Sequence, residues 1–512
     1  MKPVRMLSSI LTVGGWTLAS RILGFLRDVL IAAWLGPGAT MDAFVAAFRL
    51  PNMFRRFFAE GAFNAAFVPM FSKRLEAGEN AEGFAALALS GLALVLLVLT
   101  GLAMVFMPAL VYATAEGFAG DARFGLTVEY GRIVFPYIFF ISLAALFSGV
   151  LNAAGRFAAA AAAPVLLNVM LVTAMSIAWV LNAEVVRALV WTIPFAGMAQ
   201  LALVWDAVRR AGLHIRPVRP RWTPEMAQLL RIAIPAALAG GVMQINLLVG
   251  QQVASNYDKA VSWLYSADRL YQLPLGVVGI AVGIVLLPDL SRRLKADDDA
   301  GARAALSRAG EVSLALTIPS AVALVVIPLP LVTVLFQRGA FGVDDTAATA
   351  LAVAIYGLGL PAFVLQKILQ PLFFAREDTQ SPFRYAVVAM ILNAGLAIGL
   401  AFYIGWIAAA IATTAAAWAM VWLLLRGARP FGEVARFDVQ FRDRIWRIVV
   451  ASLIMGAVLW GAGLILNAFI LMPGLRWIAL LVLIAIGALS YFAVGQMIGA
   501  FRVCDLKAAL RR

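Results

Sequence analysis

Long apolar stretches separated by short polar loops run along the whole chain. A membrane-spanning helix needs about 20 apolar residues, and on that measure the pattern predicts about fourteen spans. The apolar runs lack the period of two that the strands of a membrane β-barrel require, so we expect an all-α polytopic membrane protein. The predicted spans start near Leu7, Met41, Phe84, Phe124, Ala160, Val185, Met226, Val261, Ala304, Thr346, Phe383, Ile404, Ile445 and Leu475.

Two parts of the chain resemble each other. Residues 48–75 and 268–294 lie about 220 residues apart, and each contains an Arg-Leu pair, then an apolar residue before a proline, then Ser with two cations. Asn168 corresponds to Asn393, each about 32 residues after a proline. An even number of spans per repeat gives both halves one orientation, related by a pseudo-twofold axis along the membrane normal. We therefore predict an N-terminal six-helix lobe at 1–215, a second six-helix lobe at 216–430 and two additional helices at 431–512.

Composition agrees with a membrane protein and excludes some kinds of site. Hydrophobic residues make up 63% of the 512 residues and charged residues 13%, which is far from the average of soluble domains. One cysteine rules out an internal disulfide and a multi-cysteine metal site. The single histidine, His214, lies in a basic loop and is not expected to be a ligand. The basic N-terminal residues lead directly into an apolar span, so no cleaved signal peptide is expected.

The net charge is +14, and the cations are spread unevenly among the loops. Alternate loops, counted from the N-terminus, hold about 27 of the 41 Lys and Arg residues, against about 5 in the opposite loops and about 9 within spans. The positive-inside rule then places both termini in the cytoplasm. This distribution explains the basic charge without nucleic acid, which we do not expect as a partner.

Several cations lie inside the first two predicted spans. Each costs roughly 2.5–3.5 kcal/mol in hydrocarbon, so the five would together cost on the order of 12–17 kcal/mol if they faced lipid. We therefore expect them to face a water-filled cavity or an anionic ligand, as in a carrier of a negatively charged molecule. These five residues are Arg21, Arg27, Arg49, Arg55 and Arg56.

Carboxylates and amides accompany these cations. Arg21 and Asp28 share one helix face, and Asn52, Arg56 and Glu60 form a stripe at i, i+4 spacing. The planar guanidinium binds two phosphate oxygens at once, so the arrangement suits a diphosphate. The predicted substrate-binding residues are Arg21, Arg27, Asn52, Arg55, Arg56 and, in the second half, Arg269. The predicted residues for gating or charge balance are Asp28, Asp42, Glu60 and Asp268.

The same residues carry a family resemblance that extends along essentially the whole chain. The sequence resembles the MurJ (MviN) family of lipid II flippases, in the multidrug/oligosaccharidyl-lipid/polysaccharide exporter superfamily. The matching strings are Ser-Arg-Ile-Leu-Gly-Phe-Leu-Arg-Asp at 20–28, Asp-Ala-Phe at 42–44, Leu-Pro-Asn at 50–52 with Arg-Arg at 55–56, and the segments 58–63, 67–69 and 267–270.

The resemblance implies a transporter of undecaprenyl-diphosphate-linked peptidoglycan precursor (lipid II). It implies movement from the inner to the outer leaflet of the bacterial cytoplasmic membrane by alternating access. Arg21, Arg27, Arg55 and Arg269 would contact the diphosphate and sugar in a central cavity, and the last two helices would form a groove for the lipid tail. No catalytic residue, metal or cofactor is expected. Expected partners are lipid II and membrane lipids, with cell-wall synthesis proteins as further candidates.

The driving force and two rival functions stay open at this stage. Membrane potential or an ion gradient would drive transport, but Asn246, Asn393 and Thr413 lack the nearby carboxylate that a sodium site favours. One rival is a flippase for another polyprenyl-diphosphate oligosaccharide. The other is a membrane enzyme that uses the same carrier, which would need a base or metal-binding carboxylates. The only acidic cluster, 297–299, is interpreted as a solvated loop or a helix start.

Overall fold

The computed structural model describes residues 3–55 and 62–500, and within them it leaves side-chain surroundings undescribed at 3–11, 62, 65, 235–247, 277–285 and 288. All regular elements in this part of the chain are helices, which confirms the all-α prediction. The chain divides into two compact units, 1–262 and 263–512. The predicted boundaries of the repeat lobes, after 215 and 430, stay a prediction.

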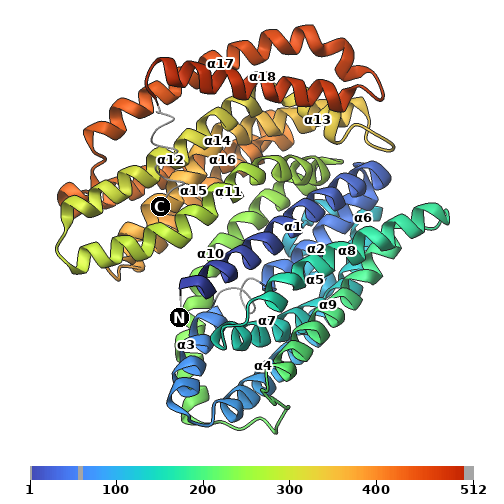
Figure 1. The fold of residues 1–512 in the computed structure, drawn as a ribbon. Helices are drawn as coiled ribbons and strands as arrows, with labels where there is room; N and C mark the ends of the chain where they lie inside the picture. The colour runs from blue at the N-terminus through green and yellow to red at the C-terminus, as the bar shows by residue number, and fades with distance from the viewer. Residues whose placement is uncertain (1–2, 56–61, 501–512) are drawn as a thin grey trace. The chain divides into compact units, whose positions relative to one another are not determined.

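The described residues of the first unit form ten α-helices, drawn from blue to green in Figure 1. They are α1 (Pro3–Leu35), α2 (Ala39–Arg55), α3 (Ala62–Ala77), α4 (Ala81–Val105), α5 (Met107–Thr114), α6 (Ala122–Val134), α7 (Tyr137–Ala153), α8 (Ala158–Val180), α9 (Val185–Arg210) and α10 (Pro224–Ser255), with a 3₁₀ turn at Glu116–Phe118. Helix α10 packs on α3 and α5, which is why it belongs to this unit.

The second unit begins within α11 (Ala260–Lys295). Its other helices are α12 (Asp299–Val326), α13 (Pro328–Leu335), α14 (Val343–Phe374), α15 (Gln380–Ile404), α16 (Ala408–Gly427), α17 (Val439–Leu471) and α18 (Arg476–Met497), with 3₁₀ turns at Gly405–Ile407 and Arg429–Ala435. Helices α17 and α18 run side by side as a hairpin, and α17 packs on α12 (Figure 1).

Polar caps start several of these helices. Asn80 and Asp298 each accept a backbone hydrogen bond from the residue three positions on, at 2.8 Å, and so begin α4 and α12. Asp438 begins α17 in the same way. Of the two interpretations of the acidic cluster at 297–299, a solvated loop or a helix start, the structure shows the helix start.

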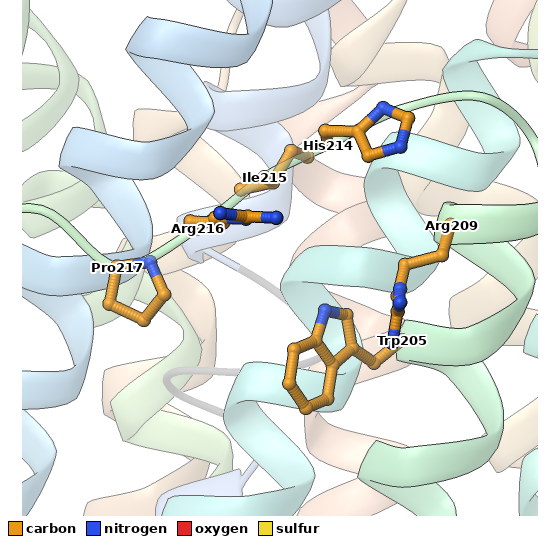
Figure 2. Close-up of a pocket in the computed structure, with 6 residues that line it drawn as sticks. All are labelled: Trp205, Arg209, His214, Ile215, Arg216 and Pro217. Atoms are coloured by element: carbon orange, nitrogen blue, oxygen red, sulfur yellow. The ribbon is translucent and has the colours of Figure 1, made fainter.

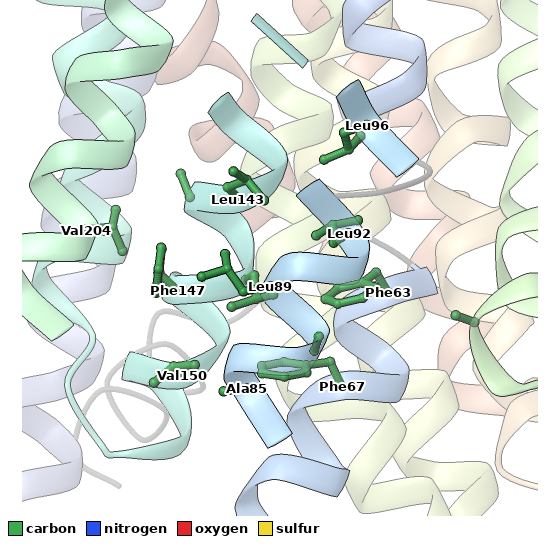
Figure 3. Close-up of a cluster of buried hydrophobic side chains, with 14 of the residues drawn as sticks. Phe63, Phe67, Ala85, Leu89, Leu92, Leu96, Leu143, Phe147, Val150 and Val204 are labelled. Carbon is green, nitrogen blue, oxygen red and sulfur yellow. The ribbon is translucent and has the colours of Figure 1, made fainter. Parts of the chain in front are cut away.

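Aromatic and aliphatic side chains fill the core of the first unit. Phe67 stacks on Phe63, Phe71 and Phe84 at centroid distances of 5.5–5.6 Å. Figure 3 shows Phe63 and Phe67 facing the leucines of α4 and the side chains of α7. Because α3 contributes so much of this core, its position relative to α4 and α7 is fixed by packing.

Nine helical stretches of the described residues are long and apolar enough to cross a membrane. They include ten of the predicted spans, because the stretch Gln380–Gly427 contains two. The other four predicted spans fall on α1, α2, α10 and α11, and three of these helices carry the charges singled out above. The chain is a multi-pass membrane protein, and the count of about fourteen spans stays a prediction.

Candidate substrate-binding site

A polar cluster joins α1 to α8 inside the first unit. The α1–α8 cluster consists of Ser20, Gly24, Arg27 and Asp28 of α1 and Asn168 of α8. Arg27 donates from Nε and Nη2 to Asp28 Oδ1 at 3.0 and 2.8 Å, and from Nη1 to Asn168 Oδ1 at 2.9 Å. Asn168 Nδ2 donates in turn to the Ser20 carbonyl at 3.1 Å. The guanidinium is thus held from two helices, which fixes its orientation.

The charged side chains of α1 differ in how far they are exposed. The side chain of Asp28 is only 4% exposed and that of Arg27 is 12% exposed, whereas Arg21 is exposed on the same helix. Arg21 has no ion-pair partner among the residues that the structure describes. Arg27 is therefore neutralised and oriented, and Arg21 is accessible to a ligand.

Gly24 lies opposite Asn168. A Cβ built on Gly24 would lie 3.5 Å from Asn168 Nδ2, which is an ordinary van der Waals contact. With no side chain at Gly24, α8 packs closely against this turn of α1.

The predicted residues of α2 are only partly described. Arg55 is half-buried at the end of α2. Asn52 is also half-buried, and its Nδ2 donates to the Phe48 carbonyl at 2.9 Å. Arg56 and Glu60 lie outside the described residues. The predicted stripe of Asn52, Arg56 and Glu60 therefore stays a prediction.

Asp42 lies in the first turn of α2, at the opposite end of this helix from Arg55, and is fully buried. It accepts hydrogen bonds from the backbone N–H groups of Lys259 at 3.1 Å and Ser262 at 2.9 Å, and also from the Ser262 hydroxyl. The Arg123 guanidinium lies 3.6 Å away. Asp42 therefore caps the first turn of α11, where N–H groups would otherwise lack partners.

Arg123 of α6 connects Asp42 to the neighbouring loops. It also pairs with Asp121 at 2.6 Å and Asp258 at 3.4 Å, and its guanidinium lies 4.6 Å from the Phe118 ring centroid. Burial would raise the pKa of Asp121, but the hydrogen bonds and charge of Arg123 outweigh it and lower that pKa below its usual value. Asp42 is thus balanced by Arg123 rather than by the predicted substrate-binding arginines.

Two of the predicted site residues, Arg269 and Asp268, lie in the second unit. Arg269 of α11 lies with its guanidinium 4.3 Å from the Tyr265 ring centroid, a cation–π geometry. Its neighbour Asp268 accepts a hydrogen bond from Gln272 one turn further along α11. Both side chains are half-buried.

Sequence comparison places the chain in a family. The sequence profile of the family described as lipid II flippase MurJ matches residues 31–484, which is most of the chain. This chain belongs to the MurJ family.

Relatives and solved structures agree with the family match. The probable lipid II flippase MurJ of Rhizobium tropici is 43% identical over 520 residues, covering 99% of this chain and 97% of the relative. That of Rhizobium meliloti is 44% identical, covering 98% and 95%. A solved lipid II flippase MurJ in an inward closed conformation gives a TM-score of 0.80 at 26% identity, covering 95% and 98%. An inward-facing MATE transporter of the MOP superfamily gives 0.67 at 14% identity, covering 81% and 95%, which shows a shared fold.

MurJ-family membership decides between a transporter and a membrane enzyme, two function classes that the sequence left open. The family consists of flippases, which are transporters. The predictions of the MurJ family and of a transporter rather than a membrane enzyme are therefore confirmed.

Two residues of this MurJ-family chain escaped the sequence reasoning about the site. Asn168 was noted only as a repeat landmark with Asn393, yet it binds Arg27 across 141 residues of sequence. The charge pattern marks Arg123 only as one of the few cations in the opposite loops, yet it is the ionic partner of Asp42. The sequence signal for Asn168 is an amide within an apolar predicted span, because such an amide needs a hydrogen-bond partner.

Proposed function

We propose that this chain is a lipid II flippase. It moves the undecaprenyl-diphosphate-linked peptidoglycan precursor from the inner to the outer leaflet of the bacterial cytoplasmic membrane by alternating access. The relatives that match almost the whole chain carry that name, and the chain shares its fold with a solved MurJ. Both termini would lie in the cytoplasm, as the charge of the loops indicates.

The observation that carries the site is the oriented guanidinium of Arg27. Asp28 and Asn168 hold it at fixed hydrogen-bond distances while 12% of the side chain stays exposed. A prealigned guanidinium binds a phosphate oxygen without a further loss of side-chain entropy. Arg27 would contact the diphosphate together with Arg21, Arg55 and Arg269, with Asn52 and Arg56 as further contacts.

The carboxylates have separate proposed roles. Asp28 keeps the Arg27 charge tolerable when no substrate is bound, because an unpaired cation in an apolar bundle is costly. Asp268 and Glu60 would do the same for Arg269 and Arg56. Asp42 would act as a gate residue, since any opening at its end of α2 must break its hydrogen bonds to the first turn of α11.

Transport would be driven by the membrane potential or an ion gradient. The sequence contains no phosphate-binding loop of the Walker type, so ATP is not proposed as the direct energy source. Cell-wall synthesis proteins are proposed as further partners.

The test is depletion of the protein in its host, followed by measurement of lipid II in each leaflet with a lipid II-cleaving enzyme that cannot cross the membrane. Wild-type protein should restore outer-leaflet lipid II, and Arg27→Ala and Arg269→Ala should not. Arg187→Ala is the matched control, because Arg187 is 66% exposed and pairs only with Glu184 among the described residues.

Two outcomes would contradict the proposal. Normal outer-leaflet lipid II after depletion, in a host without a second flippase, would point to another lipid-linked oligosaccharide. Full rescue by both arginine variants would mean that these cations only hold the helices together.

A further inference from the structure

A second cationic site lies where α9 ends. A cavity of about 580 Å³ opens between the last turns of α9 and the loop that follows it. We call this the α9–loop pocket; its lining residues are Trp205, Arg209, His214, Ile215, Arg216 and Pro217. Figure 2 shows Trp205 and Arg209 on α9 and the residues 214–217 along the loop. None of them belongs to the proposed substrate site.

The charge of the pocket is positive. Arg209, Arg216 and His214 line it without a carboxylate. The nearest acidic residue on α9, Asp206, pairs with Arg210 at 2.8 Å instead. Neither Arg209 nor Arg216 has an ion-pair partner in the part of the chain that the structure describes. Two guanidinium groups and an imidazole on one cavity are a donor set suited to a phosphate group.

The loop is held in place before any ligand binds. Gly212 has a φ of +83° and ends α9 with a left-handed residue, as helix C-termini favour. Ile215 is 2% exposed and packs in the core of the first unit. The Val218 N–H donates to Ser90 Oγ of α4 at 2.8 Å. The pocket therefore does not depend on ordering a flexible loop, which would weaken binding.

The surroundings of the pocket resemble a membrane interface. Trp205 is 44% exposed beside the pocket, and Trp222, further along the same loop, is 76% exposed. Tryptophan is enriched at the level of lipid headgroups, and α9 is one of the apolar membrane-spanning stretches. Cations at this level attract anionic phospholipids.

We propose that the α9–loop pocket binds a phosphate group, through Arg209 and Arg216 with His214 as a third donor. The group comes either from an anionic phospholipid headgroup at this membrane face or from inorganic phosphate in solution. The site is independent of the proposed flippase function, because its residues and its ligand differ from those of the substrate site.

The test uses the purified full-length chain and native mass spectrometry with dioleoylphosphatidylglycerol, against dioleoylphosphatidylcholine as the neutral lipid. The pocket variant carries Arg209→Gln and Arg216→Gln. The matched control carries Arg219→Gln and Arg221→Gln, which remove the same charge from exposed positions of the same loop outside the pocket. Melting temperatures without added lipid verify that both variants fold.

We expect wild type to bind phosphatidylglycerol in preference to phosphatidylcholine. The pocket variant should bind phosphatidylglycerol roughly twenty- to thirty-fold more weakly, at about fivefold per arginine, and the control should stay close to wild type. In a second arm, millimolar inorganic phosphate is added alone. If phosphate raises the melting temperature of wild type and control but not of the pocket variant, the bound group is free phosphate. If only phosphatidylglycerol raises the melting temperature in this pattern, the bound group is the lipid headgroup.

Two results would overturn the proposal. If the pocket variant and the control lost phosphatidylglycerol binding equally, the binding would depend on the general positive charge of the loop and not on the pocket. Binding of both probes by the pocket variant as by wild type would show that these arginines hold no phosphate.

Discussion

At the scale of single residues, two of the cations inside the predicted spans have defined neighbours. Arg27 has Asp28 and Asn168, and Arg269 has the face of Tyr265. Such partners lower the cost of a charge away from bulk water and also fix its direction. Asn168 is central to this arrangement because it bonds both Arg27 and the backbone of Ser20.

The first prediction concerns Asn168→Ala. The change removes the hydrogen bond to Arg27 and the one to the Ser20 carbonyl. We expect a loss of about 0.6–1 kcal/mol of stability per bond, measured by thermal unfolding. We also expect weaker lipid II binding, because Arg27 is no longer held from α8.

The matched control is Gly24→Ala in the same cluster. Its added methyl group would make an ordinary contact with Asn168 at 3.5 Å, so folding and lipid II binding should be nearly unchanged. Unchanged lipid II binding in Asn168→Ala would contradict a positioning role for the amide.

At the scale of elements, charged side chains hold helix ends and helix pairs. Asp42 of α2 caps the first turn of α11. In the second unit, Glu311 of α12 binds Arg308 of the same helix and Arg444 of α17, and Arg308 also pairs with Asp438 at 2.7 Å. The α17–α18 hairpin is thus attached to the rest of its unit by ion pairs as well as by apolar packing.

The second prediction concerns Asp42→Asn. An amide keeps a hydrogen-bond acceptor but loses the negative charge that faces Arg123 and the α11 N-terminus. We expect a loss of about 1–3 kcal/mol in thermal unfolding and faster hydrogen exchange at the Ser262 N–H. Asp258→Asn is the control, since Asp258 also pairs with Arg123 but is 92% exposed and should matter little. Equal effects of the two changes would argue against a capping role.

The third prediction concerns Glu311→Gln. The Glu311 side chain is 10% exposed and serves two arginines, which the change leaves without their shared carboxylate. We expect roughly 1–3 kcal/mol lower stability and faster proteolysis of the α17–α18 hairpin. Glu433→Gln removes an exposed partner of Arg303 and should cost less than about 1 kcal/mol. The idea fails if the hairpin of Glu311→Gln resists protease as well as wild type does.

At the scale of the whole molecule, the chain is a multi-pass helical protein of the MurJ family in two compact units. Its apolar side chains remain exposed along α15, α17 and α18, as on surfaces that face lipid. How the loops are oriented across the membrane follows so far from their charge, so it is the property most worth testing at this scale.

The fourth prediction concerns that orientation. In a Cys504→Ala background, Arg219→Cys places the only thiol in the loop after α9, and Ala119→Cys places it in the loop between α5 and α6. A maleimide that cannot cross membranes should label Ala119→Cys in intact spheroplasts, and Arg219→Cys only after the cells are opened. The reverse pattern would place both termini outside.

Much of the fold could be predicted from the sequence because its signals are local. Apolar runs predicted the helices, and loop charge predicted an orientation. The charged strings at 20–28 and 50–56 are specific enough to indicate the family by themselves. The same strings predicted which cations matter, and the structure gives partners for Arg27, whereas Arg56 lies outside the described residues.

The sequence by itself determined that this protein is helical, membrane-embedded, rich in intramembrane cations and related to MurJ, because length, hydropathy and motif strings are properties of neighbouring residues. Only the tertiary structure decided which partner each charge meets. Arg27 meets Asn168 across 141 residues, and Asp42 meets Ser262 across 220. Spacing along one helix cannot encode such pairs, since the packing of distant helices brings them together.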